Sequence, residues 1–435
     1  MSSTAETAAP AARGGAPSRS PRGWRIVAAL AVTQTIGYGV LYYAFSVFLA
    51  PMARDLNASG AQIAAALTGS ILIAALCAPL VGRRLDAHGG RGLMTAGSVL
   101  GTGAVLAWSR VDSLPQLYAV FAVIGVACSM VLYESAFAVI VSWFDGPVHG
   151  RGRAGALLAL TVVAGFASSI FLPLTGLLVD SYGWRHALVV LALTYGVAAI
   201  PLHALVVRRP ARTGRQGATT EERAGIVRAA TRRRPFWLLV IAFTANGGAA
   251  AVMAVLLITY LIHLGHSPVL AATLAGLLGV LSVTGRLLTT GLQRRMPAAL
   301  IAAAIFTLQG VAAALLPLAG RTVPGAVGCV LGFGLGFGIA SITLPHLLVE
   351  RYGTAAYASL SGRIAAFSVA DKALAPLGAV ALAQAAGYAW VMAAVALACV
   401  VAAVALLAYH RVCAAARSLK SGRSPSSSWR ISSLQ

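Results

Sequence analysis

The chain has 435 residues, of which 59% are hydrophobic and 10% are charged. A soluble domain of this size could not hide so much apolar surface, so the composition excludes an ordinary globular protein. The net charge of +22 raises nucleic acid as a partner, but the basic residues are grouped between apolar stretches, as in a membrane topology signal. We therefore expect contact with anionic membrane lipid and no nucleic acid partner.

Twelve apolar stretches are long enough to cross a bilayer, because about twenty apolar residues span one as a helix. Uninterrupted runs of this kind are typical of helices and not of strands. The sequence therefore predicts an all-α membrane protein with twelve transmembrane helices. They lie near residues 24–46, 60–82, 92–110, 115–143, 150–179, 184–207, 236–262, 268–292, 297–318, 322–350, 355–386 and 388–410.

The charges also predict the orientation of these spans. If the N-terminus is inside, the cytoplasmic segments hold 26 of the 33 Lys and Arg residues, and the opposite loops hold 4. This positive-inside bias predicts a multi-pass protein of the cytoplasmic membrane with both termini in the cytoplasm. We expect residues 1–23 to be a disordered cytoplasmic tail and residues 411–435 to be a second cytoplasmic tail.

The first predicted span places Tyr38 and Tyr42 one helical turn apart. Their hydroxyls can hydrogen-bond a carboxylate, which makes both residues candidate substrate ligands. Alternatively, the rings pack as core or interface aromatics.

The short loop after the second span contains Gly82, Asp86, Gly89 and Arg91 in the pattern G-x3-D-x2-G-x-R. Glycines permit a tight turn and a close approach between helices. Asp86 can sit against a helix N-terminus or a basic partner.

Glu134 lies midway along the fourth predicted span, among apolar neighbours. Such surroundings disfavour a charged carboxylate, and a carboxylate that gains and loses a proton is what proton coupling needs. The alternatives are a permanently protonated glutamic acid and a salt bridge with Arg286 or Lys372.

Residues 208–235 form the longest polar stretch between the spans and contain nine arginines. This basic linker separates six predicted spans in residues 24–207 from six in residues 236–410. A Pro-Leu motif followed by a Gly-aromatic pair starts at Pro173 in one half and at Pro376 in the other. We infer a parallel duplication of two six-helix bundles with the binding site between them.

Arg286 lies inside the eighth predicted span, where a full positive charge costs roughly 2.5–3.5 kcal/mol on insertion scales. Its planar fork matches a carboxylate, which makes it a candidate ligand for an organic anion. The residues on its helical face are small and polar, as expected of a helix that lines a water-filled cavity. They are Gly279, Ser282, Thr289 and Thr290. The alternatives are a structural ion pair and an arginine that snorkels to the cytoplasmic side.

Lys372 is a second cation at membrane depth, in the eleventh predicted span. We predict that it binds substrate together with Arg286; the alternative is that its neighbour Asp371 neutralises it. Asp371 points about 100° away from Lys372, because adjacent residues diverge on a helix. It either pairs with Lys372, caps a neighbouring helix or carries a proton.

Motifs that would indicate an enzyme or a cofactor are missing. The sequence contains no His-Glu-x-x-His and no Gly-x-Ser-x-Gly, and its five cysteines lack metal-ligand spacing. We therefore expect no catalytic site, no metal and no cofactor.

With twelve predicted spans and a central basic linker, the loop at 82–91 resembles the signature loop of the major facilitator superfamily. Within that superfamily, four stretches look like the monocarboxylate and oxalate–formate transporter branch: residues 37–51, 142–144, 173–185 and 285–291. The resemblance implies the major facilitator fold, a latch role for the signature loop and anion binding by Arg286. Oxalate carriers of this branch pair an eighth-helix Arg with an eleventh-helix Lys, which Arg286 and Lys372 match.

The chain departs from the animal monocarboxylate pattern at two places. Its first span has no Lys, and Ser282 stands four residues before Arg286 where that pattern has Asp. Proton coupling would therefore need Glu134 or Asp371, and anion exchange stays open.

We predict a monomeric secondary active transporter that moves a small mono- or dicarboxylate across the cytoplasmic membrane by alternating access. Protons or a counter-anion would drive it, and the alternative is a proton-driven exporter of a drug-like or secondary metabolite.

Overall fold

The computed structural model describes residues 21–144, 146–208, 218–293 and 295–421. These residues form helices, and no β-strand occurs among them, so the predicted all-α fold is confirmed. The N-terminal part contains α1 (Pro21–Tyr38), the π-helix η1 (Gly39–Tyr43), α2 (Ala44–Asp55), α3 (Gly60–His88), α4 (Gly90–Trp108), α5 (Leu114–Val131), α6 (Tyr133–Trp143), α7 (Gly146–Ala164), α8 (Ala167–Pro201) and the π-helix η2 (Leu202–Val206).

The C-terminal part follows the helix α9 (Thr220–Thr231), which lies within the predicted linker and begins with a capping box between Thr219 and Glu222. It contains α10 (Arg234–His263), α11 (Pro268–Leu292), α12 (Ala298–Ala319), α13 (Val323–Gly334), α14 (Ala340–Tyr352), α15 (Tyr357–Ala386) and α16 (Tyr388–Ser421).

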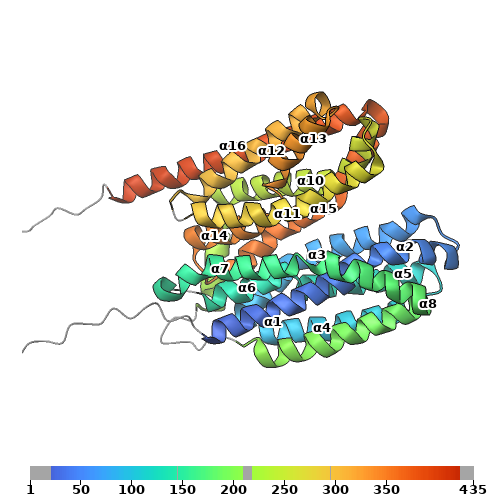
Figure 1. Ribbon diagram of the computed structural model, residues 1–435. Helices are drawn as coiled ribbons and strands as arrows, with labels where there is room; N and C mark the ends of the chain where they lie inside the picture. The colour runs from blue at the N-terminus through green and yellow to red at the C-terminus, as the bar shows by residue number, and fades with distance from the viewer. Residues whose placement is uncertain (1–20, 145, 209–217, 294, 422–435) are drawn as a thin grey trace, which may run out of the picture.

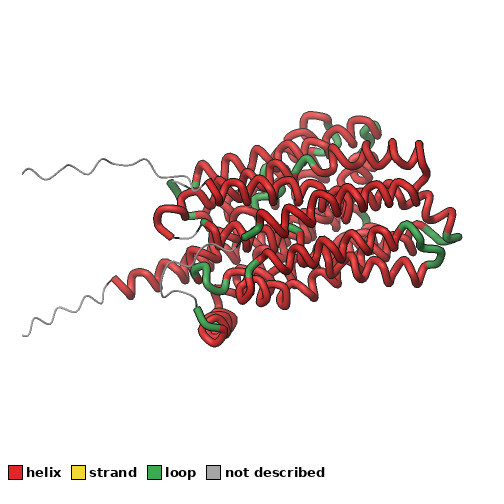
Figure 2. Tube along the Cα trace, turned by 90° about the horizontal axis from the view of Figure 1, so that it is seen from below, coloured by secondary structure: helices red, strands yellow, loops and turns green. Residues whose placement is uncertain are grey.

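The helices are arranged in two layers (Figure 1). Helices α1–α8, in blue and green, form one layer, and α10–α16, in yellow to red, form the other. The first residues of α1 and the last residues of α16 lie at the same end of the molecule in both views (Figures 1 and 2). We call it the terminal end.

Nine helical stretches among the described residues are long and apolar enough to cross a membrane. One of them, Gly152–Val206, has 55 residues and contains a break at Gly183, where φ is +75°. The predicted stretches 92–110 and 322–350 are helical but not among the nine, because α4 is long enough but not apolar enough and because α13 and α14 are separate short helices. The count of twelve spans stays a prediction.

The tails and linker differ in detail from the prediction. Helix α1 begins at Pro21, inside the predicted disordered tail, and α16 continues to Ser421, past the predicted end of the bundle at residue 410. Residues 1–20, 209–217 and 422–435 lie outside the described residues.

The fourth predicted span is two helices and not one, which corrects the placement of Glu134 midway along a continuous helix. The chain leaves helical geometry at Leu132, with φ −80° and ψ −167°. Two side chains compensate the carbonyls that this break frees: Gln34 Nε2 donates to Val131 O at 2.6 Å, and Ser135 Oγ donates to Ser129 O at 3.0 Å. Such compensation is needed because lipid offers no hydrogen bonds.

The two layers meet most closely where α3 crosses α15, toward the terminal end. A side chain at Gly82 would collide with the Ala358 carbonyl, and one at Gly362 would collide with the Ala78 carbonyl. Each helix thus places a glycine against the backbone of the other helix, and the absence of a side chain there permits this close crossing. Apolar side chains from both layers share one buried core at this end, including Leu85, Val141, Leu347, Leu360 and Phe236.

Candidate functional site

A cavity of about 220 Å³ lies between the two layers. Both layers contribute polar or charged side chains to its lining, as the predicted inter-half site requires. They are Tyr38, Ser129, Tyr133 and Glu134 from the N-terminal part and Ser341, Tyr357, Ser361, Ser368 and Lys372 from the C-terminal part.

Lys372 lies near the middle of α15 and lines this cavity. Its side chain passes close over Gly247 of α10, since a Cβ built there would lie 3.1 Å from Lys372 Cε. Glu134 and Asp371 are close enough to interact electrostatically with its ammonium group. The predicted cation therefore reaches the cavity, with two carboxylates nearby.

Glu134 lies in the first turn of α6, directly after the break at Leu132. Its Oε2 accepts a hydrogen bond from Ser361 Oγ on α15 at 2.8 Å, which links the two layers. A helix N-terminus favours a carboxylate, as does the nearby Lys372. Glu134 thus occupies a position where its protonation state can affect both the cavity and the contact between the layers.

Arg286 does not line the cavity as described but lies beside it. Its Nε donates to Gly338 O at 3.2 Å, and its Nη1 donates to Thr161 O across the layer boundary at 3.0 Å. The hydroxyls of Tyr43 and Tyr133 lie within electrostatic reach of the guanidinium. No carboxylate forms an ion pair with Arg286 in the described ranges, so its charge is balanced only by neutral dipoles.

Gly338 is a residue of this site that the sequence did not reveal. It lies in the interruption between α13 and α14, and its φ of +123° strongly favours glycine. A Cβ there would collide with the Ser282 hydroxyl and crowd the Arg286 guanidinium. The alternating glycines at 332–338 resemble a packing motif, and only the fold distinguishes Gly338 from the others.

The tyrosines form a cluster around the break in the fourth span. Tyr38 lines the cavity, and its ring centroid lies 4.6 Å from that of Tyr133. Tyr42 does not line the cavity as described; its ring lies 5.3 Å from that of Tyr43, and its side chain is 38% exposed. Tyr43 and Tyr133, which the sequence analysis did not select, are the tyrosines that interact electrostatically with Arg286.

Asp371 faces a different space from Lys372. It lines a groove between α10, α15 and α16 whose other residues are apolar or glycine. Its carboxylate lies against Gly248, since a Cβ at that glycine would collide with Asp371 Oδ2. Gly248 lies in the middle of α10, so this contact does not cap that helix, and pairing with Lys372 and proton transfer stay predictions.

The signature loop lies at the terminal end, between the two layers. Asp86 accepts hydrogen bonds from the Ala358 and Ser359 backbone N–H groups, at 3.0 and 2.7 Å, and so caps the start of α15. Gly89 has φ +79° and ends α3, which glycine permits. Arg91 is exposed at the start of α4.

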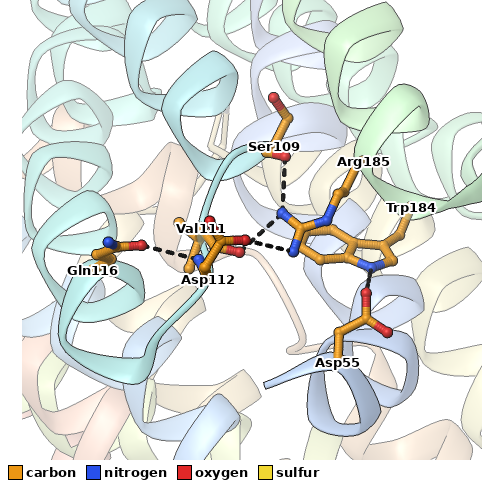
Figure 3. A network of polar contacts seen from close by, with 7 residues as sticks. All are labelled: Asp55, Ser109, Val111, Asp112, Gln116, Trp184 and Arg185. Carbon is orange, nitrogen blue, oxygen red and sulfur yellow. Dashed lines mark hydrogen bonds and ion pairs between the residues drawn. The ribbon is translucent and has the colours of Figure 1, made fainter.

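The Gly-Trp-Arg motif at 183–185 joins helix ends within the N-terminal part (Figure 3). Trp184 Nε1 donates to Asp55 Oδ2 at 2.7 Å. Arg185 donates to the Ser109 and Val111 carbonyls and forms an ion pair with Asp112 at 3.0 Å. This network fastens three helix connections and lies apart from the cavity.

Residues 30–370 match the sequence profile of the Major Facilitator Superfamily. The chain is similar to Monocarboxylate transporter 13 from Bos taurus, with 25% identity over 338 residues that cover 76% of each protein.

Three solved structures share the fold. The human organic anion transporter MFSD10 (TETRAN) superposes with a TM-score of 0.67 at 14% identity, covering 89% of this chain and 100% of that one. The E. coli fucose:proton symporter FucP gives 0.69 at 15% identity, covering 88% and 98%. A bacterial homologue of the iron transporter ferroportin, in an outward-facing state, gives 0.72 at 16% identity, covering 89% and 99%.

Proposed function

Because the chain belongs to the Major Facilitator Superfamily, a family of membrane transporters, we propose that it is a secondary active transporter of a small organic anion, a mono- or dicarboxylate. The observation that carries this proposal is Arg286, a membrane-depth cation without an acidic partner in the described ranges, next to a cavity between the layers. An intramembrane charge without a counter-charge is a functional site by default.

The chemistry around Arg286 favours a carboxylate. Two of the five guanidinium N–H groups are used by the Gly338 and Thr161 carbonyls, which orient the group and leave the others for a ligand. The hydroxyls of Tyr43 and Tyr133 add hydrogen-bond donors at neutral pH. Planar cationic donors with phenolic O–H groups match the two oxygens of a carboxylate.

Proton coupling is assigned to Glu134 in this proposal. It touches α15 through Ser361 and lies near Lys372, so gain or loss of a proton changes both an inter-layer hydrogen bond and the charge of the cavity. Asp371 is the second candidate, although it faces the groove beside α16. If Glu134 keeps one protonation state throughout the cycle, exchange against a counter-anion replaces symport.

Alternating access fits the placement of the inter-layer contacts. The Asp86 cap on α15 and the crossing of Gly82 with Ala358 lie at the terminal end, which we propose to be cytoplasmic on the basis of the positive-inside bias. In this conformation these contacts join the layers on that side. Release of Asp86 from α15 would accompany opening there.

The similar proteins support the same class of substrate. Monocarboxylate transporter 13 and the organic anion transporter MFSD10 carry names that state anionic substrates. The fucose symporter and the ferroportin homologue share the fold but are named for other substrates.

An aromatic lining supports a second candidate, proton-driven export of a drug-like or secondary metabolite. Tyr38, Tyr133, Phe137 and Phe243 all line the cavity, and such rings accept varied apolar ligands. Export of this kind predicts that aromatic substitutions reduce transport more than loss of Arg286 does.

Uptake of labelled mono- and dicarboxylates into proteoliposomes tests the proposal, with and without an inward proton gradient and with and without internal anion. We expect Arg286→Gln to abolish uptake, and Arg110→Gln, which changes an exposed loop arginine, to leave it unchanged. Unchanged carboxylate uptake by folded Arg286→Gln protein would refute anion binding at this residue and favour the export function.

A further inference from the structure

A second pocket lies at the terminal end of the N-terminal part, away from the cavity between the layers. Three arginines line it: Arg22 and Arg25 come from the start of α1, and Arg208 follows η2. The remaining lining is the largely apolar set Ile26, Trp143, Leu205 and Val206. We call this site the arginine pocket.

The arginine pocket lies at a membrane boundary, because three apolar stretches begin or end there. The stretch Arg22–Asp55 begins at it, and the stretches Leu114–Trp143 and Gly152–Val206 end at it. Tryptophan and arginine at span ends are typical of the headgroup region of a bilayer. A ligand in this pocket would therefore meet both water and the edge of the hydrocarbon.

The three arginines carry positive charge that no described acidic residue compensates. All three are exposed, no acidic residue lines the pocket, and no ion pair involves them within the described part of the chain. Arg22 and Arg25 are three residues apart on α1 and so share a face. Arg208 Nε donates to Leu205 O at 3.3 Å, which orients its guanidinium and leaves its Nη groups for a ligand.

The apolar side of the pocket distinguishes a lipid from a soluble anion. The Trp143 indole N–H donates to Arg208 O at 2.6 Å. This bond holds the chain that follows η2 beside the end of α6. Leu205 is 62% exposed next to these arginines. An acyl chain would cover this apolar surface, whereas inorganic phosphate would use only the guanidinium groups.

We propose that the arginine pocket binds the phosphate group of an anionic phospholipid, with an acyl chain along Trp143 and Leu205. Guanidinium groups form paired hydrogen bonds with phosphate oxygens, and anionic leaflets attract juxtamembrane arginines by about 1 kcal/mol each. The arginine pocket shares no lining residue with the cavity between the layers.

The test is native mass spectrometry of the full-length protein in neutral detergent, titrated with phosphatidylglycerol or phosphatidylcholine. We expect one tightly bound phosphatidylglycerol, and the triple variant R22Q/R25Q/R208Q should bind it about 100-fold more weakly. The matched control R228Q/R232Q/R234Q removes three exposed arginines outside the pocket and should change this binding little. Equal thermal unfolding midpoints would show that both triple variants are folded.

Two outcomes would overturn the proposal. Equal losses in the two triple variants would mean diffuse charge attraction and no site. Displacement of the lipid by excess inorganic phosphate, with no effect of Leu205→Asn on lipid affinity, would mean a site for a soluble anion. We expect Leu205→Asn to weaken phosphatidylglycerol binding while all three charges remain.

Discussion

The two membrane-depth cations of this protein are held in different ways. Arg286 is oriented by the backbone carbonyls of Gly338 and Thr161, and no acid in the described chain pairs with it. Lys372 lines the cavity with Glu134 and Asp371 nearby. A cation balanced by neutral dipoles keeps its attraction for an anion, whereas one flanked by carboxylates loses or regains it as they titrate. On this basis we propose that Arg286 binds the anion, while the attraction of Lys372 for an anion depends on the protonation of Glu134 and Asp371.

After the loss of uptake expected for Arg286→Gln, the largest expected effect comes from Arg286→Lys, which keeps the charge and removes the planar fork. We expect carboxylate transport (kcat/KM) to fall about 100-fold, because two charge-assisted hydrogen bonds are lost at about 1.5 kcal/mol each. Proteoliposome uptake at equal reconstituted protein measures it. Near-normal uptake would mean that charge alone matters at this position, which would remove the difference between the two cations.

Gly338→Ala should impair transport although it adds or removes no charged group. The φ of +123° disfavours alanine, and the added methyl would crowd the Arg286 guanidinium. We expect a loss of about tenfold, since strain of this kind costs about 1–3 kcal/mol. Gly328→Ala is the matched control, because a Cβ there meets nothing within 4 Å. Equal effects of the two substitutions would contradict a special role for Gly338.

Glu134→Gln tests whether Glu134 couples transport to protons. The amide imitates the protonated acid and can keep the Ser361 hydrogen bond, but it cannot release a proton. We expect gradient-driven uptake to lose its pH dependence while exchange of substrate across the membrane continues. Retained proton-driven accumulation would assign coupling to another group, and Asp371→Asn would be measured next.

Lys372→Gln should reduce transport less than Arg286→Lys, by about tenfold, since it removes one partly compensated charge. Its effect should also depend on Glu134. In the double variant Glu134→Gln/Lys372→Gln we expect a smaller loss of substrate affinity than the two single losses predict, because residue 134 is then not left as a charged carboxylate without its cation. Strict additivity in this cycle would show that the two residues do not interact.

The smallest effect is expected at Gly247, where a Cβ would lie 3.1 Å from Lys372 Cε. Gly247→Ala should shift the ammonium by a few tenths of an ångström and change KM by only about threefold, with kcat preserved. Gly378→Ala, at a glycine with open space around it, serves as the control. A large change in kcat would instead point to a role for Gly247 in helix movement.

The sequence predicted the features that depend on local composition. Apolar runs identified the helices, basic residues between them gave the expected topology, and the loop at 82–91 identified the family. These features are readable because a bilayer acts on each segment separately: hydrocarbon thickness sets helix length, and leaflet charge sets the placement of Lys and Arg. The same reason made it possible to select Arg286, Lys372 and Glu134, since a charge on any of these side chains costs free energy within its apolar segment.

Only the tertiary structure decided how these residues are used. No proline or glycine marks the break at Leu132, which depends on Gln34 from another helix to bond a freed carbonyl. The partners of Arg286 also come from distant segments, with Thr161 lying 125 residues away in sequence. Such contacts form when two helices pack together, and no local pattern encodes them. The composition of each helix therefore determined that this chain crosses a membrane and belongs to a transporter family, while packing between helices determined which charges stay uncompensated.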